Sequence, residues 1–263
     1  MGLNFIEISF HMLICGDKTY YWPKGMAPEH RRGIRALLKE RGLRTGILIP
    51  TSQTAVPEQF APLKIEDIGG LSDFDVGQIG SLPWMVEQAL KAAADLDADL
   101  IDDIHLSFAR DPDALGGVKR LMKSAEQCGV KVGIENKDER TCGEMLDALQ
   151  KLQSRNAGIT FDVGHAYKRL RDSESVAQLV ASLGGSIIHT HIHDYTASVP
   201  HSYVGGGDIN WILIIRAFKA INYQGSLTLE ISPERQHVLT LPPFPDLEIL
   251  RCKWILEYLL KDT

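Results

Sequence analysis

Four short apolar stretches of the chain each end at a side chain that could bind a metal ion or move a proton: Glu135, Asp162, His191 and Glu230. Burying a carboxylate where an apolar strand ends is costly unless a metal ion, another cation or a reaction requires it. Two Glu, one Asp and one His form a hard, anionic ligand set. Such a set suits Mn²⁺, Co²⁺ or Mg²⁺, with Zn²⁺ as an alternative, and it differs from the Cys-rich and His-rich sets of structural zinc.

A metal-free carboxylate cluster is the competing interpretation of these residues. Without a cation, three clustered carboxylates would repel one another and shift their pKa values strongly. The residue types therefore favour one bound divalent metal ion.

Alternation within the strands indicates that the candidate ligands point the same way. Residues two apart in a strand share a face, so Asp162 shares its face with Thr160, while Phe161 lies on the opposite face. The stretches before Glu135 and Glu230 repeat this pattern of small or polar residues on the ligand face. In a parallel barrel the inward face points at the axis, and active sites lie at the C-terminal ends of the strands.

Three histidines, His189, His191 and His193, alternate along the predicted strand 186–193. A lone inward histidine is more often a core residue than a ligand. Three on one face, beside strands that end in carboxylates, favour a functional role for at least one of them. His191 and His193 lie nearest the strand end, and His189 is predicted to be structural.

Strands and helices alternate along the whole chain. Strands are predicted at 4–11, 44–49, 100–105, 131–135, 157–162, 186–193 and 226–231. Helices are predicted at 26–41, 83–96, 113–128, 141–153, 173–183 and 245–260, and a further helix follows Trp211 and ends at about 221. Such alternation predicts parallel strands joined by helical crossovers. With 263 residues, the chain fits one α/β domain over 1–263, a (β/α)8 TIM barrel. Seven strands are counted, so the first βα unit is either absent or unrecognised. The long loop at 51–82 has little periodicity and is either functional or a solvated insertion.

Composition and charge limit the classes of partner and the cellular location that can be expected for this chain. A net charge of −6 disfavours nucleic acid, because phosphate binding calls for a basic surface. No apolar run approaches the length of a membrane span, and charge inside the first apolar run disfavours a signal peptide. The four cysteines have no metal-site spacing, which predicts reduced thiols and a cytoplasmic location. Homo-oligomerisation stays open.

Several motifs together resemble the xylose isomerase-like TIM barrels, the superfamily of sugar isomerases, epimerases and endonuclease IV. The matching stretches, in chain order, are Gly133-Ile-Glu-Asn136, Phe161-Asp-Val-Gly-His165, His191-Ile-His-Asp194, His201-Ser-Tyr-Val-Gly-Gly-Gly207 followed by Asp208-Ile-Asn-Trp211, and Leu227-Thr-Leu-Glu230. Chains of this family usually carry one more strand and helix before the strand that Leu3-Asn-Phe-Ile-Glu7 resembles, which would explain the count of seven.

The resemblance implies roles for individual residues. Glu135, Asp162, His191 and Glu230 would be ligands of one divalent metal ion, and Glu135 and Glu230 would also be the catalytic carboxylates. The implied substrate-binding residues are His105, His165, His193, His201, Asn136 and Lys137. Asn136 and Lys137 are expected at the rim of the pocket.

Some positions depart from the family pattern. The endonuclease branch has further zinc ligands where this chain has Leu48-Ile-Pro50 and Val199, which disfavours DNA repair. The arginine that ketose 3-epimerases place after the ligand histidine is also missing, and Ala197 stands near that position.

The resemblance favours a metal-dependent isomerase or epimerase of sugars or sugar derivatives, acting by proton transfer through a metal-stabilised enediolate. Three alternatives stay open: a metal-dependent dehydratase or lyase on a polyol ketone, an endonuclease IV-like AP endonuclease, and a non-catalytic sugar-binding barrel. The expected substrate is a small sugar or polyol. Asp194 is predicted either to orient a histidine or to stand in a turn, and Gly205-Gly-Gly207 either to bind phosphate or to form a flexible turn.

Overall fold

The structure, a computed structural model, describes residues 3–9, 13–15, 18–20, 28–48, 90, 92–105, 112–137, 141–196, 199–231 and 245–262. The predicted loop at 51–82 and most of the predicted helix at 83–96 lie outside the described residues. The chain divides into two compact units, which are described separately. The N-terminal unit contains Gly2–Ile134 and Gln150–Ala157, and the C-terminal unit contains Glu135–Leu149 and Gly158–Thr263.

Seven parallel strands of the described chain form the main sheet, in the order β1-β4-β5-β6-β7-β8-β11. Each strand is followed in the sheet by the next main-sheet strand of the chain, as short connections between consecutive strands favour. The α/β class, the parallel strands and the count of seven are therefore confirmed. Two short hairpins, β2-β3 and β10-β9, were not predicted, because strands of three or four residues are too short to show a period.

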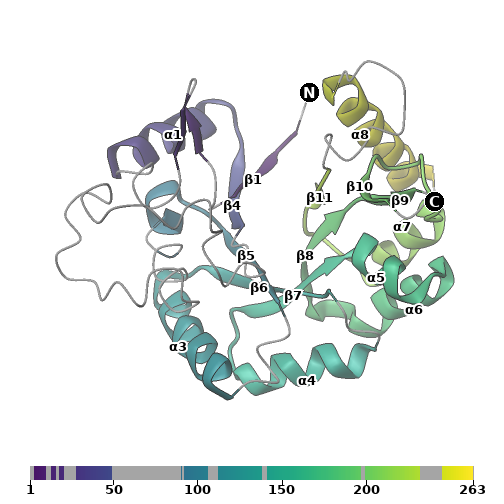
Figure 1. Cartoon of the computed structure of the whole chain (residues 1–263), viewed down its shortest axis with the longest axis horizontal. Coiled ribbons are helices and arrows are strands. Elements are labelled where there is room, and N and C mark those ends of the chain that lie inside the picture. Colours follow the sequence, from purple (N-terminus) through teal and green to yellow (C-terminus); the bar gives the residue numbers. More distant parts are fainter. Residues whose placement is uncertain are drawn as a thin grey trace. The chain divides into compact units, whose positions relative to one another are not determined.

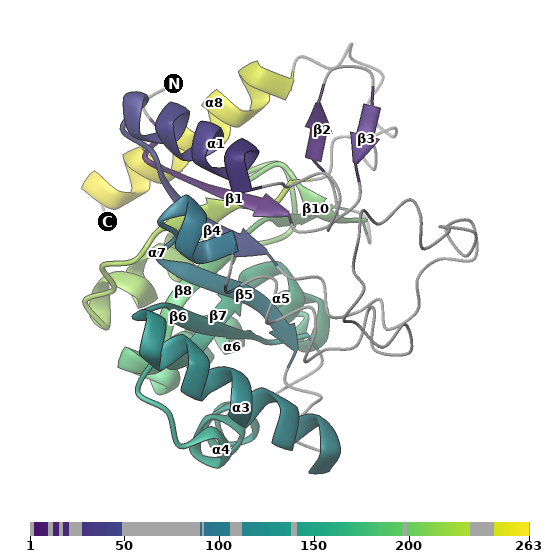
Figure 2. The same cartoon turned by 90° about the vertical axis from the view of Figure 1, so that its left-hand side faces the viewer.

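The N-terminal unit begins with β1 (Phe5–Ser9), which pairs in parallel with β4 (Arg44–Leu48). The hairpin strands β2 (Leu13–Cys15) and β3 (Lys18–Tyr20) follow β1, and α1 (Pro28–Glu40) connects to β4 and lies beside it (Figure 2). The unit continues with β5 (Leu100–His105), α3 (Pro112–Cys128) and β6 (Lys131–Glu135), whose last residue, Glu135, belongs to the C-terminal unit. Gly42 and Gly129, with φ of +64° and +71°, follow α1 and α3 in the left-handed conformation that glycine tolerates best.

The remaining elements belong to the C-terminal unit, except for the last three residues of α4 and the first residue of β7. They are α4 (Cys142–Leu152), β7 (Ala157–Asp162), α5 (Val163–Leu170), α6 (Ser173–Leu183), β8 (Ile187–Ile192), β9 (Asp194–Thr196), β10 (Val199–Ser202), α7 (Trp211–Ala220), β11 (Leu227–Leu229) and α8 (Pro245–Asp262) (Figure 1). In this unit α5 contacts both α6 and β8, while α7 packs between α6 and α8. A capping box precedes α4: Thr141 Oγ1 accepts from the Glu144 amide and Glu144 Oε2 accepts from the Thr141 amide.

Apolar residues on the outward faces of the strands form the core of the C-terminal unit. Phe161 and Ile192 are fully buried, and the Phe161 ring meets the edge of the Phe218 ring of α7 at a centroid distance of 6.3 Å. Alternation then places Thr160 and Asp162 on the opposite face, as predicted. The helices therefore hold one face of β7 and leave the other for the site.

Two predictions about the elements were wrong. The helix α5 follows Asp162 directly, although no helix was predicted between residues 162 and 173. The strand predicted to end at His193 ends at Ile192, and Asp194 begins β9.

No helix in the part of the chain that the structure describes combines the length and apolar character of a membrane span. The cysteines whose side chains are described, Cys128, Cys142 and Cys252, are free thiols, as predicted. The cytoplasmic location and the single domain over 1–263 stay predictions.

Candidate metal and substrate site

Four neighbouring elements bring the predicted ligands to one edge of the C-terminal unit. Glu135 and Asp162 are the last residues of β6 and β7, His191 lies near the end of β8, and Glu230 follows β11. Parallel pairing sets Asp162 opposite His191 and Thr228 opposite the same histidine. The Glu230 amide donates to the Ile192 carbonyl at 3.1 Å. Parallel strands end at the same edge, so register alone brings these side chains together.

The four side chains form a cluster with ligand-like spacing. One ligand atom from each of the four lies within 4.8 Å of every other. His191 Nδ1 lies 2.9 Å from Glu135 Oε1, 3.5 Å from Glu230 Oε2 and 4.0 Å from Asp162 Oδ2. Two oxygen or nitrogen ligands about 2.1 Å from one ion are about 3 Å apart at right angles and about 4.2 Å apart when opposite. The observed spacings fall in that range, so the set fits a single divalent cation.

The Asp162 carboxylate divides its two oxygens between support and the cluster. Oδ1 accepts the His165 amide at 2.6 Å, as the N-cap of α5. Oδ2 is buried and receives no hydrogen bond from the described residues. Buried polar oxygens normally have partners. An oxygen of this kind beside three other potential ligands is suited to bind a metal ion. Burial disfavours the charged form, but the His165 and His193 rings outweigh burial and hold the pKa of Asp162 well below its usual value.

The two glutamates differ in access. Glu135 is 1 % exposed, and Lys137 Nζ lies 3.4 Å from its Oε2. The Glu230 side chain is 32 % exposed to solvent. A molecule entering from solvent would therefore meet Glu230 first. The Lys137 side chain is 31 % exposed, consistent with the predicted place at the rim.

Two partly exposed histidines flank the cluster. His165 Nδ1 lies 3.2 Å from the Asn136 carbonyl oxygen, which places the proton of the neutral ring on Nδ1 and leaves Nε2 as an acceptor. Burial lowers the pKa of His165, and the nearby Asp162 carboxylate offsets this only in part. His201 Nδ1 lies 3.3 Å from the Glu230 carbonyl oxygen and 3.6 Å from Glu230 Oε2. Both rings lie beside the cluster, and their contact with substrate stays a prediction.

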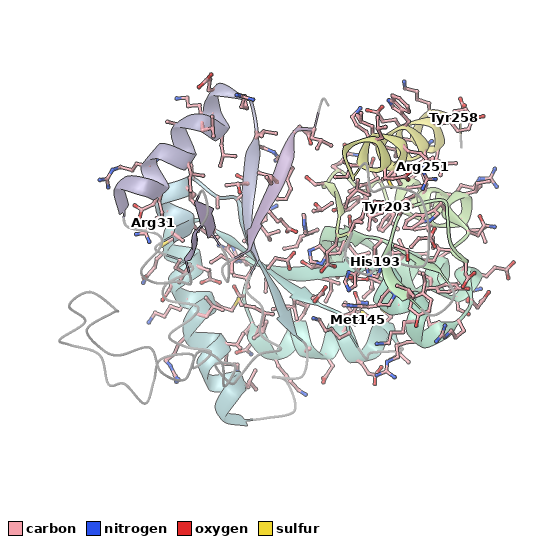
Figure 3. All side chains as sticks on the ribbon, turned by 45° about the horizontal axis from the view of Figure 1, so that its top comes forward. Arg31, Met145, His193, Tyr203, Arg251 and Tyr258 are labelled. Carbon is pink, nitrogen blue, oxygen red and sulfur yellow. The ribbon has the colours of Figure 1, made fainter. Side chains whose placement is uncertain are left out.

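Two residues predicted to bind substrate are instead buried. Asn136 is 1 % exposed and does not lie at the rim. Its side-chain nitrogen donates to the Asp162 carbonyl and its side-chain oxygen accepts from the Asp162 amide, at 3.0 and 2.9 Å. The Asn136 amide thus replaces a strand partner for the backbone of Asp162. His193 is fully buried as well; its interior position is labelled in Figure 3.

His189 and His105 complete the predicted histidines. His189 is buried below the cluster, with Nε2 3.2 Å from Thr228 Oγ1, in the structural position that was predicted. His105 ends β5, but its side chain lies outside the described set, so its contact with substrate stays a prediction.

Asp194 is neither a histidine-orienting side chain nor a simple turn residue. Its buried carboxylate accepts from the backbone amides of the following loop and from the Trp211 indole; the donors are Tyr195, Gly205, Gly207, Ile209 and Trp211. The amides of Gly205 and Gly207 therefore already donate to Asp194, which disfavours the prediction that the glycine run binds phosphate. A Cβ on Gly207 would also overlap the Asp194 carboxylate, so that glycine is needed for close approach.

Sequence reasoning missed the capping role of Asp162 and the support from Asn136. The first had a signal, because an Asp three residues before His165 has the spacing of an N-cap to the amide that it binds. The second had none, because an asparagine after a strand is equally typical of a turn.

A sequence model of the family described as "Xylose isomerase-like TIM barrel" matches residues 1–246. The chain belongs to this family. It is 33 % identical over 120 residues to an uncharacterized protein of Methanocaldococcus jannaschii, covering 43 % of this chain and 41 % of that protein. It is 29 % identical over 123 residues to a D-psicose 3-epimerase of Enterocloster bolteae, covering 44 % of this chain and 38 % of that enzyme. These matches span about two fifths of the relatives' length.

Solved structures show the same fold across most of the chain. A crystal structure of D-psicose 3-epimerase with D-tagatose, from Clostridium cellulolyticum H10, superposes with a TM-score of 0.71 at 18 % identity. The superposition covers 98 % of this chain and 90 % of that one. The likeness establishes a TIM-barrel architecture.

Proposed function

We propose that this chain is a metal-dependent epimerase or isomerase of a small sugar. The observation that carries the proposal is the placement of two glutamates in one cluster: a carboxylate oxygen of Glu135 lies 2.9 Å, and one of Glu230 lies 3.5 Å, from His191 Nδ1. Two carboxylates that contact the same small volume from different strands can act on one carbon from different sides. The relatives named as D-psicose 3-epimerases support a ketose as the substrate.

Four residues would hold the metal ion: Glu135, Asp162, His191 and Glu230. A divalent cation bound there would polarise a substrate carbonyl and acidify the adjacent C–H bond. The hard donor set supports Mn²⁺, Co²⁺ or Mg²⁺ over a closed zinc site.

The protein's own groups would move the proton. Glu230, the more exposed carboxylate, takes the proton from the carbon beside the carbonyl, and the electron pair of that C–H bond shifts toward the carbonyl oxygen. Glu135 in its protonated form then returns a proton to the same carbon from the opposite face, which inverts that centre; each carboxylate afterwards exchanges its proton with solvent. The Nε2 atom of His165 accepts a hydrogen bond from a substrate hydroxyl, and His201 contacts the sugar beside Glu230. Lys137 offsets the charge of Glu135 at the mouth.

The direct test follows exchange of a carbon-bound hydrogen. The purified chain, loaded with Mn²⁺, is incubated with D-psicose, D-tagatose and D-fructose in D₂O, and NMR reports deuterium incorporation and the appearance of the epimer. Glu230→Gln and Glu135→Gln should each slow exchange by about 10²-fold or more, the usual contribution of a general acid or base. Glu174→Gln, an exposed glutamate on α6, is the matched control and should retain the wild-type rate.

Other outcomes point elsewhere. Elemental analysis of the purified chain should find one divalent ion per chain, and either three zinc ions or none would contradict the proposed metal centre. Near-normal exchange in both Gln variants would remove the two glutamates from the chemistry. A product lighter by one water would identify the dehydratase alternative instead, and incision of an abasic duplex would identify the endonuclease.

A further inference from the structure

His193 uses both ring nitrogens on two different parts of the site. The backbone amide of His201 donates to Nδ1 at 2.9 Å, and Nε2 lies 3.1 Å from Asp162 Oδ1. Nδ1 also lies 3.2 Å from the Asp194 carbonyl oxygen. The contact with the His201 amide is the shorter one, and an amide N–H can only donate, so Nδ1 accepts a hydrogen bond and the proton of the neutral ring is on Nε2, facing the carboxylate. The ring therefore connects the end of β7 with β10.

His201 depends on this contact in two ways. Its φ of +56° lies in the left-handed region that a non-glycine residue adopts at a cost. Its backbone N–H is satisfied by His193, and its ring stacks on the His193 ring at a centroid distance of 4.2 Å and an angle of 24°. The His193 ring thus supports both the backbone and the side chain of His201.

Asp162 depends on the same ring. The His165 amide and the His193 ring together hold Oδ1, and this leaves Oδ2 directed at the candidate metal position. Outer contacts of this kind orient metal ligands, and their loss typically lowers metal affinity about 10- to 100-fold.

Gly164 makes the arrangement sterically possible. A Cβ at position 164 would overlap the His193 ring at Cε1 and Nδ1. Position 164 lies in the first turn of α5, between the capping Asp162 and His165. Any side chain there would force the His193 ring away from Asp162.

The contacts also exclude His193 from a metal-ligand role. His165, His193 and His201 offer nitrogens within 4.8 Å of one another, which is close enough for a metal site. Nδ1 of His193, however, accepts a hydrogen bond from the backbone amide of His201, and Nε2 carries the proton of the neutral ring toward Asp162. No lone pair of the neutral ring is left for a metal ion.

We infer that His193 is a positioning residue that couples the Asp162 carboxylate to His201, with Gly164 providing the space for its ring. The coupling rests on the proposed function only in taking Asp162 as a metal ligand and His201 as a contact to substrate. It predicts that the two halves of the site can be separated by mutation, because each nitrogen of the ring serves one of them.

Two substitutions remove one nitrogen each. His193→Asn places an acceptor near Nδ1 but nothing near Nε2, so it should weaken Mn²⁺ binding about 10-fold or more while the KM for the sugar stays close to wild type. His193→Gln places an amide near Nε2 but no acceptor near Nδ1, so it should keep Mn²⁺ affinity and raise KM. Gly164→Ala should impair both. Isothermal titration of the metal-free full chain with Mn²⁺ gives the affinity, and the exchange assay gives kcat and KM.

A third measurement does not require the metal. In the metal-free protein, Asp162→Asn should shift the amide resonance of His201, because the two residues communicate through the His193 ring.

The outcomes separate the inference from the proposed function. If the wild-type chain binds no Mn²⁺ but the His201 resonance shifts, the metal proposal fails and the coupling stands. An unchanged resonance overturns the coupling. The coupling is also overturned if His193→Asn and His193→Gln weaken Mn²⁺ binding and raise KM to the same extent, and if both effects follow the loss in free energy of unfolding of each variant.

Discussion

The carboxylate of Asp194 offers a quantitative test of the structure, because it is fully buried and accepts five hydrogen bonds. Oδ1 accepts from the amides of Tyr195 and Ile209 at 2.8 and 3.2 Å. Oδ2 accepts from the amides of Gly205 and Gly207 at 3.0 and 3.1 Å, and from the Trp211 indole at 2.8 Å. The loop from β10 to α7 is therefore organised around one side chain.

Asp194→Asn changes one acceptor into a donor and hardly changes the volume. If the asparagine NH₂ group takes the Oδ1 position, the two donors to Oδ1 lose their acceptor. If it takes the Oδ2 position, the three donors to Oδ2 lose theirs. Each buried donor without a partner costs about 1–3 kcal/mol. The cheaper orientation therefore predicts a loss of roughly 2–6 kcal/mol, a large part of the 5–15 kcal/mol typical of a folded domain.

Urea unfolding of the metal-free chain, followed by circular dichroism, measures this loss. Asp208→Asn is the matched control, since Asp208 is exposed in the same loop and should change the free energy of unfolding by no more than about 0.5 kcal/mol. If Asp194→Asn also falls within that margin, the five hydrogen bonds do not stabilise the loop as argued.

Three further predictions concern the helices and strands around the site. Thr141→Ala removes the capping box of α4 and should lower the free energy of unfolding by about 1 kcal/mol, measured by urea titration; Thr141→Ser, which keeps the hydroxyl, should match wild type. Gly158→Ala would overlap the Ile188 side chain and should cost about 1–3 kcal/mol in the same assay. Adding Ile188→Ala, which removes all three overlapping carbon atoms, should restore part of that loss; no recovery would refute the clash. Hydrogen bonds from the Ser175 side chain and amide lower the pKa of Asp172, the N-cap of α6. The stabilisation from ionised Asp172 is therefore present above its unfolded pKa of about 3.9 and lost as pH falls through the lower folded pKa. The difference in Tm between wild type and Asp172→Asn should shrink across that acidic range, and a constant difference would contradict the shift.

Much of the fold could be predicted because buried parallel strands and their crossover helices differ clearly in period. The boundaries of the strands 100–105, 131–135 and 157–162 match the structure. The helix α5 could not be found in this way. It has eight residues and starts directly on Asp162, so there is no separating loop and barely two turns in which an amphipathic pattern could appear.

The candidate site was predictable to the extent that strand ends determine it. Glu135, Asp162 and His191 converge because parallel register places strand ends at one edge. Predictions failed where a residue supports a neighbour rather than the substrate. Asn136 and His193 have side chains typical of polar recognition, and only three-dimensional contacts show that their hydrogen bonds go to Asp162 and His201.

The hydrogen bonds of Asn136 take the place of direct backbone pairing beside Asp162. Where two strands pair directly, their backbones must stay at ladder spacing, because each amide reaches a carbonyl of the other strand. Beyond Glu135, a side chain reaches across to satisfy both backbone groups of Asp162. The two chain segments can then diverge by the length of an asparagine side chain without leaving a buried amide unsatisfied. A sheet that ends this way can widen beyond Glu135 while the backbone of Asp162 stays fixed, which leaves space beside the candidate site that direct strand pairing would fill.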